Sequence, residues 1–410
     1  MRLIINAFLL LTALAALSCC FAESNMNDGA LSSTQITQLT IQLQTMAIQV
    51  KQKFELPGLS IAVLLPNNKT PLLITSGNKQ LSSEQPTTPE TLFQVGSTTK
   101  TFTAELLAQA LNNKTISLQD TLGKFFPEYP KWQEITIEQL ANQTSGIFDY
   151  IDSKNWFPQL AATTRAHQVW DAKALVDIAY QHPNYFPAGS GWHYANTNYV
   201  LLGMILEKVN HQPLSVQMKT LIRKANLTHT YYLPTPYPTM ILNRMAHGYG
   251  YYDQIYDMTD ENGSWLQAAG AMVSTPEDLV KWMQKLFTDS LSTSLIQYLQ
   301  MKDTTTGQPA SMLDQSSYSF ALFRMNTPEG LVWFTPGLTS GYITGMVYAP
   351  CQNIYFAYST NKAPVAKLQG YLMMTLLHTL KSNFHNSIIQ NAPSYCSTLK
   401  PAAQFIFPLH

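Results

Sequence analysis

Charge is the first property that this sequence has little of. Charged residues make up 12% of its 410 positions, and 25 Lys and Arg residues are balanced by 25 Asp and Glu residues. Binding to nucleic acid or to an anionic surface requires an excess of positive charge. We therefore predict no nucleic-acid partner, and the polar surface has to come largely from Ser, Thr, Asn and Gln.

Metal-ligand patterns are also missing from the sequence. The four cysteines form no Cys-x-x-Cys pair, and His182 and His193 do not form a His-x-x-x-His pattern. We therefore expect no metal and no other cofactor. Cys351 and Cys396 are candidates for a disulfide in an oxidising compartment, although their spacing does not establish the pair.

The longest apolar run, Leu3–Leu17, is too short for a comfortable membrane span. It follows a positive start at Met1-Arg2 and precedes a small-x-small cleavage site at residues 20–22, as in a signal peptide. We expect residues 1–22 to be removed and the mature chain, without a transmembrane segment, to be periplasmic or secreted. Lipid modification of Cys19 is the alternative.

Hydrophobic periodicity predicts one α+β domain over residues 23–390, followed by a tail at 391–410. We expect an antiparallel sheet built from both chain ends (about 34–110 and 270–385), flanked by helices, with a mostly helical insertion at about 111–269. The helices expected outside the insertion are 34–54, 275–288 and 366–382, and the strands are 58–64, 71–75, 318–325, 331–334, 342–348 and 354–358.

Ser97 and Lys100 form the most informative pair in the sequence. Residues at i and i+3 share a helix face, and a serine hydroxyl becomes a good nucleophile when a neighbouring base takes its proton. The same Ser-x-x-Lys spacing occurs at three other places, but only Ser97 opens a long segment of helical periodicity. Because serine is also a normal N-cap, helix capping is the alternative role of Ser97.

Tyr194 and Asn196 form the only Tyr-x-Asn pattern in the chain, in a Gly- and Asn-rich loop before an apolar helix. Loops of this kind often carry site residues. A tyrosine can act as a general base when a nearby cation lowers its pKa from about 10. The alternative is a partly buried loop tyrosine whose hydroxyl binds backbone.

Together these segments resemble the serine β-lactamase and penicillin-binding-protein superfamily. The resemblance is strongest to its class C β-lactamase-like branch, which includes D-Ala-D-Ala carboxypeptidases and esterases, and it covers roughly residues 35–380. Gln143 stands where histidine is common in this branch. The matching segments are Phe93–Lys100, Ile135–Gly146, Phe186–Lys208, Leu227–Tyr231 and Ala269–Leu279.

The third motif of the superfamily differs here. Its Lys-Thr-Gly or His-x-Gly sequence lines the site, and the basic residue helps to bind a substrate carboxylate. Alignment on Gly337 places Thr335 at the basic position, and a second register, Thr339–Gly341, also lacks a cation. By itself, Thr-Pro-Gly is a turn signal. The difference favours ester or amide substrates without a free carboxylate, or a weakened enzyme.

The resemblance implies a secreted serine hydrolase in which Ser97 is acylated. Proton transfer would be carried out by Lys100 and Tyr194. The substrate would be positioned by Asn196, Thr335 and Gly337. The oxyanion hole would be formed by the N–H groups of Ser97 and Leu338. Either Lys100 is a neutral base, or it stays charged and lowers the pKa of Tyr194, which is then the base.

The expected substrate is a small molecule or peptide. The leading hypothesis is a D-Ala-D-Ala carboxypeptidase acting on peptidoglycan stem peptides. A carboxylesterase of the same fold and a non-catalytic protein that binds the cell wall or a partner are the alternatives. The sequence leaves the oligomeric state open.

Overall fold

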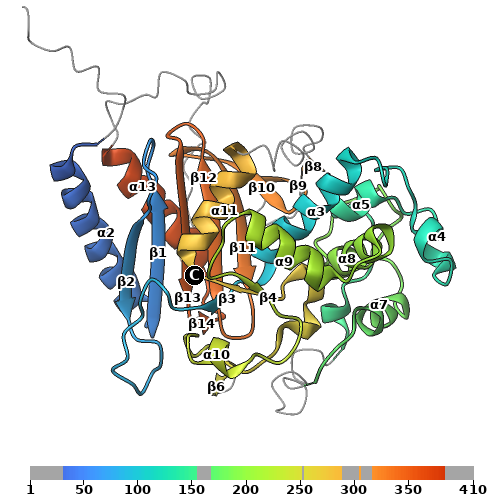
Figure 1. Cartoon of the computed structure of the whole chain (residues 1–410), viewed down its shortest axis with the longest axis horizontal. Coiled ribbons are helices and arrows are strands. Elements are labelled where there is room, and N and C mark those ends of the chain that lie inside the picture. Colours follow the sequence, from blue (N-terminus) through green and yellow to red (C-terminus); the bar gives the residue numbers. More distant parts are fainter. Residues whose placement is uncertain (1–30, 155–167, 252–253, 289–303, 306–315, 384–410) are drawn as a thin grey trace, which may run out of the picture.

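An eight-stranded antiparallel sheet forms the frame of the computed structural model, which describes residues 31–154, 168–251, 254–288, 304–305 and 316–383 (Figure 1). The α+β class expected from the sequence is confirmed, because the first two strands join the later ones in one sheet. The order is β2 (Leu72–Gly77), β1 (Gly58–Leu64), β13 (Ile354–Thr360), β12 (Ile343–Ala349), β11 (Gly330–Leu338), β10 (Leu322–Thr327), β9 (Ser316–Ser319) and β8 (Thr304–Thr305).

The two chain ends meet where β1 pairs with β13. Their register places Ile61 opposite Tyr358. Every residue of β1 and of β13 is buried, so both faces of the sheet are covered at this point. Burying an aliphatic side chain contributes about 1.5–3 kcal/mol, and this pairing therefore stabilises the frame strongly.

Helices cover both faces of the sheet. The helices α2 (Ser33–Lys53) and α13 (Leu368–Asn383) pack against each other on one face, whereas α11 (Pro276–Thr288) crosses β1, β12 and β13 on the other (Figure 1). Thr275 caps α11, because its Oγ1 accepts a hydrogen bond of 3.3 Å from the Asp278 N–H. Within the described ranges, none of the helices combines the length and hydrophobicity needed to cross a bilayer.

The helical part packs beside the sheet around α8 (Asn196–Asn210), which contacts α3, α5, α7 and α9 (Figure 1). Almost all of the first eleven residues of α8 are buried, because it is surrounded on several sides. This packing brings the start of α8 next to the start of α3. The bounds of the contacting helices are α3 (Lys100–Asn112), α5 (Ile137–Ala141), α7 (Ala172–Tyr180) and α9 (Leu214–Lys224).

One local prediction needs correction. The single strand predicted at 318–325 is a tight hairpin, in which Phe320 and Ala321 have positive φ values of 44° and 72° between β9 and β10. The apolar residues continue through the turn, so hydrophobicity alone conceals it. The region at 111–269 also contributes short strands, including β4 (Tyr231–Tyr232) and β5 (Tyr249–Tyr251), to two small sheets.

Cys351 is disulfide-bonded. Its expected partner, Cys396, lies outside the described residues, as do the predicted signal peptide at 1–22 and the tail at 391–410.

Candidate active site

Ser97 lies in a single 3₁₀ turn, Gly96–Thr99, that runs directly into α3. Its side chain is half-buried, whereas Thr98 and Thr99 are fully buried. The N-cap position of α3 belongs to Thr99, and no side chain caps the helix there. The capping alternative for Ser97 is therefore not realised, and its hydroxyl is available for other contacts.

Lys100 is buried at the first position of α3, with 1% of its side chain exposed. Its Nζ lies 3.0 Å from Ser97 Oγ, 2.7 Å from Asn196 Oδ1 and 2.9 Å from the carbonyl oxygen of Ala269. The last two atoms can only accept hydrogen bonds. A neutral amine would donate its two hydrogens to them, and its lone pair would then face Ser97.

Burial lowers the pKa of Lys100 from 10.5 to about 7, because the charged ammonium loses its hydration. The negative charge of Asp149 opposes this shift. Burial in turn raises the pKa of Asp149 to about 7. Near neutral pH the amine of Lys100 is thus available in its basic form.

Asp149 is a site residue that sequence reasoning missed. Its carboxylate accepts hydrogen bonds from the backbone N–H and the side-chain amide of Asn196, at 2.8 and 3.1 Å. The amide oxygen of Asn196 is therefore turned towards Lys100. The only available signal was the position of Asp149 three residues after the predicted Ile135–Gly146 segment.

Tyr194 meets Ser97 and Lys100 from the segment that leads into α8. Its hydroxyl is hydrogen-bonded to Ser97, and its ring centroid lies 4.8 Å from Lys100 Nζ. Burial raises the pKa of Tyr194 well above its usual range. Of the two bases left open by the sequence, the electrostatics favour Lys100.

Gln143 holds this segment in place. Its Oε1 accepts hydrogen bonds from the backbone N–H of Ala195, at 3.0 Å, and from the side-chain amide of Asn198. A buried amide oxygen with two donors replaces the histidine that is common at this position in the resembled branch. The replacement therefore leaves Tyr194 and Asn196 anchored.

The end of β11 lies against the Ser97 turn. Gly96 has a φ of +50°, and a Cβ there would lie 2.8 Å from the Leu338 nitrogen and 2.6 Å from its carbonyl oxygen. A Cβ on Gly337 would lie 2.1 Å from the carbonyl oxygen of Val95. The two glycines thus permit a close approach between the backbone of the Ser97 turn and the end of β11 at Leu338.

Thr335 occupies the same face of β11 as Gly337, because side chains two residues apart in a strand point the same way. It is buried and pairs with Met346 of β12. In the described part of the chain, Thr335 is not among the hydrogen-bond partners of Lys100 Nζ. The structure therefore brings Ser97 and Lys100 into hydrogen-bond contact. Thr335 lies on β11, the strand that packs against the Ser97 turn.

The sequence model of the β-lactamase family matches residues 46–374, a range that includes every residue of this cluster. The chain belongs to the β-lactamase family. It is a serine hydrolase of the fold shared by β-lactamases and penicillin-binding proteins.

Relatives of this β-lactamase-family chain are diverse. Penicillin-binding protein 4* of Bacillus subtilis is 24% identical over 318 residues, which are 74% of this chain and 68% of the relative. Protein flp of Staphylococcus aureus is 26% identical over 343 residues, which are 81% of this chain and 65% of the relative. The chain thus spans about two thirds of the length of either relative.

Solved structures confirm the fold. A D-amino acid amidase from Ochrobactrum anthropi SV3, complexed with D-phenylalanine, superposes with a TM-score of 0.74 at 22% identity. The match covers 85% of this chain and 99% of the amidase. At this level of identity the similarity establishes the fold alone.

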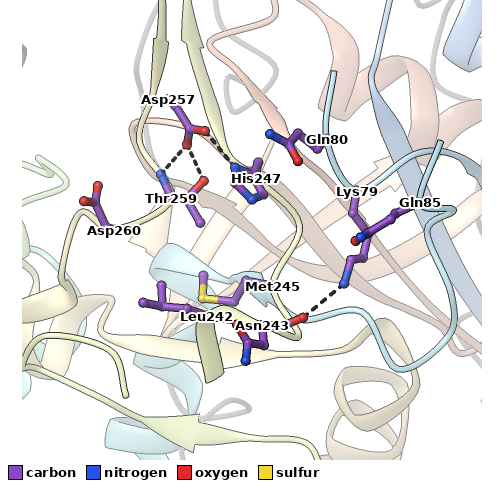
Figure 2. A pocket seen from close by; sticks show the side chains of 10 residues that line it. All are labelled: Lys79, Gln80, Gln85, Leu242, Asn243, Met245, His247, Asp257, Thr259 and Asp260. Carbon is purple, nitrogen blue, oxygen red and sulfur yellow. Dashed lines mark hydrogen bonds and ion pairs between the residues drawn. The ribbon is translucent and has the colours of Figure 1, made fainter. Parts of the chain in front are cut away.

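In this family member a pocket of about 660 Å³ has a lining that includes none of Ser97, Lys100 and Tyr194 (Figure 2). Lys79 and Asp260 lie on opposite sides of it, and His247 Nδ1 is paired with Asp257 at 2.7 Å. The described residues contain no group of three or more His, Cys, Asp or Glu side chains arranged to hold a metal.

Proposed function

We propose that this protein hydrolyses amide bonds through an acyl-enzyme on Ser97, with a D-amino acid as the acyl group. The observation that carries the proposal is the position of Lys100 Nζ, 3.0 Å from Ser97 Oγ and fixed by two acceptors on its other side. A base of pKa about 7 within hydrogen-bond reach of a hydroxyl is suited to activate it at neutral pH.

In the first step, Ser97 Oγ attacks the substrate carbonyl carbon and its proton passes to Lys100 Nζ. The carbonyl oxygen becomes an oxyanion, which the N–H groups of Ser97 and Leu338 stabilise. One such donor typically contributes about a 100- to 1000-fold rate enhancement.

In the second step, the carbon–nitrogen bond breaks and the leaving amine takes a proton. In this proposal Tyr194 passes the proton from Lys100, and two contacts support that role: its hydroxyl contacts Ser97 and its ring adjoins Nζ. Water then attacks the ester on Ser97 and gives its proton to Lys100. The acid product leaves, and the proton returns to Ser97 Oγ.

Two relatives support the proposed acyl group, and this sequence supports the proposed leaving group. The name of penicillin-binding protein 4* supports a site that recognises penicillin, and the name of the D-amino acid amidase supports a D-amino acid amide as substrate. A carboxypeptidase has to bind the carboxylate of its leaving group, and Thr335 offers no positive charge for it. This favours an amide or short peptide whose leaving group is uncharged.

Intact-mass measurement of the purified protein tests the acyl-enzyme. After incubation with a fluorophosphonate we expect one covalent adduct per chain, and none in the Ser97→Ala variant. A parallel incubation with a penicillin asks whether the site recognises a D-Ala-D-Ala mimic. Absence of any adduct would favour the alternative of a non-catalytic binding protein.

Turnover assays distinguish the leaving groups. We expect release of ammonia from D-alanine amide to exceed release of D-alanine from a peptide ending in D-Ala-D-Ala, with Ser97→Ala inactive on both. Faster release of D-alanine would restore the carboxypeptidase hypothesis. Activity on p-nitrophenyl esters alone would indicate a carboxylesterase.

Secretion is part of the proposal and rests on the leader-like residues 1–22. Expression of the full chain should yield an exported protein whose N-terminus lies near Glu23. Recovery of an unprocessed chain from the cytoplasm would contradict it.

A further inference from the structure

Glu261 is a buried acid that the proposed chemistry does not use. Only 1% of its side chain is exposed, and it lies in the loop just before the turn Gly263–Trp265. Its Oε1 accepts a hydrogen bond of 2.9 Å from Ser340 Oγ. Its backbone carbonyl accepts another, also 2.9 Å, from the side-chain amide of Gln94.

These two anchors connect Glu261 to residues that are close in the chain to Leu338 and Ser97. Ser340 follows Leu338 by two residues, and Gln94 precedes Ser97 by three. The loop of Glu261 is therefore attached to both segments that supply the oxyanion N–H groups. It also continues into Ala269, whose carbonyl binds Lys100 Nζ.

The second carboxyl oxygen, Oε2, is buried and has no hydrogen-bond partner among the residues that the structure describes. A buried oxygen without a donor carries a free-energy penalty that a ligand can remove by donating to it. Burial raises the pKa of Glu261 to about 8, and the nearby charge of Asp260 adds to this shift. The carboxyl of Glu261 is thus mostly neutral at neutral pH, and a cation bound beside it would ionise it.

We infer that Glu261 is a specificity residue that binds an ammonium group on the acyl part of the substrate. The inference rests on the proposed acyl-enzyme. The α-amine of an amino-acid amide is attached to the carbon next to the carbonyl that Ser97 attacks, so its recognition group has to lie beside the oxyanion donors. The family's third motif carries a basic residue where this chain has Thr335, and here the charged group of the site is instead the Glu261 carboxylate. The proposed substrate is therefore an amino-acid amide with a free amine.

A pair of boronic acids tests this inference without depending on the leaving group. The probes are the boronic-acid analogue of D-alanine with a free amine, and its N-acetyl derivative. Each forms a reversible bond to a serine Oγ, so its affinity can be measured by competition with fluorophosphonate labelling of Ser97. We expect the wild-type protein to bind the free amine more tightly, because only that probe carries an ammonium.

The Glu261→Gln variant keeps the shape and the bond to Ser340 but removes the ionisable group. We expect its affinity for the free-amine probe to fall by about 10- to 100-fold, the usual range for a charge-assisted hydrogen bond, and its affinity for the N-acetyl probe to stay unchanged. Glu329→Gln is the matched control, because this acid lies in the turn between β10 and β11, where it pairs with His378 and Lys381, and its loss should leave both affinities unaltered.

Equal affinity of the wild-type protein for the two probes would overturn the inference, and this comparison needs no variant to fold. An equal loss of both affinities in Glu261→Gln would indicate a purely structural role and overturn it as well. Absence of fluorophosphonate labelling would overturn the proposed function and this inference together. Labelling without an amine preference would overturn the inference alone.

Discussion

The pH dependence of Ser97 acylation tests the central electrostatic claim. With an ordinary lysine pKa of 10.5, only a few molecules in ten thousand would carry a neutral Lys100 at pH 7, whereas a pKa of about 7 makes roughly half of them neutral. Burial therefore increases the population of the basic form by roughly a thousandfold. In free energy, the shift corresponds to about 5 kcal/mol of destabilised charge.

The assay is the rate of fluorophosphonate labelling between pH 5 and pH 10. Because the neutral amine is the base, we expect the rate to rise with pH and to reach its plateau above about pH 8, with a midpoint near 7. The Tyr194→Phe variant should keep this midpoint, since the pKa of Tyr194 is raised and its hydroxyl is not the base.

The Asp149→Asn variant changes the pKa of Lys100 without changing the base itself. The negative charge of Asp149 favours the ammonium form of Lys100, so its removal should lower the pKa of Lys100 and move the midpoint to lower pH. The asparagine oxygen can still accept from Asn196, which preserves the geometry. If the labelling rate of the wild-type protein had its midpoint above pH 9, Lys100 would be refuted as the base. The same holds if the labelling rate of Tyr194→Phe no longer depended on pH.

Two further substitutions test the backbone of the site and its support. Gly96→Ala should reduce acylation by about 100-fold or more, because the new Cβ would push the Leu338 backbone away. Gly330→Ala is its control, because Gly330 lies at the far end of β11, also has a positive φ (+122°), and a Cβ there would meet other atoms only at van der Waals distance. Equal losses in both variants would contradict the oxyanion role. Gln143→Ala should lower the free energy of unfolding by about 1–3 kcal/mol, since it leaves the Ala195 N–H without its acceptor. Unchanged stability in a denaturant titration would show that this anchor is dispensable.

The sequence predicted the elements whose signals are local. The helix expected at 34–54 and the hairpin at 58–64 and 71–75 are close to α2, β1 and β2, because periodicity and turn residues are properties of neighbouring positions. The strand predicted at 318–325 was wrong because a two-residue turn, at Phe320 and Ala321, interrupts the apolar run without a Gly or Pro to mark it.

By itself, the sequence determined the pairing of Ser97 with Lys100, since a three-residue separation at a helix start fixes which side chains adjoin. It also determined the family, through the order of several short segments. Only the tertiary structure decided how Lys100 is made basic. That depends on burial and on Asn196 and Ala269, which are distant in the chain. For the same physical reason, the environment of Glu261 could not be predicted: its partners Ser340 and Gln94 come from segments that meet only when the sheet and the helical part pack together.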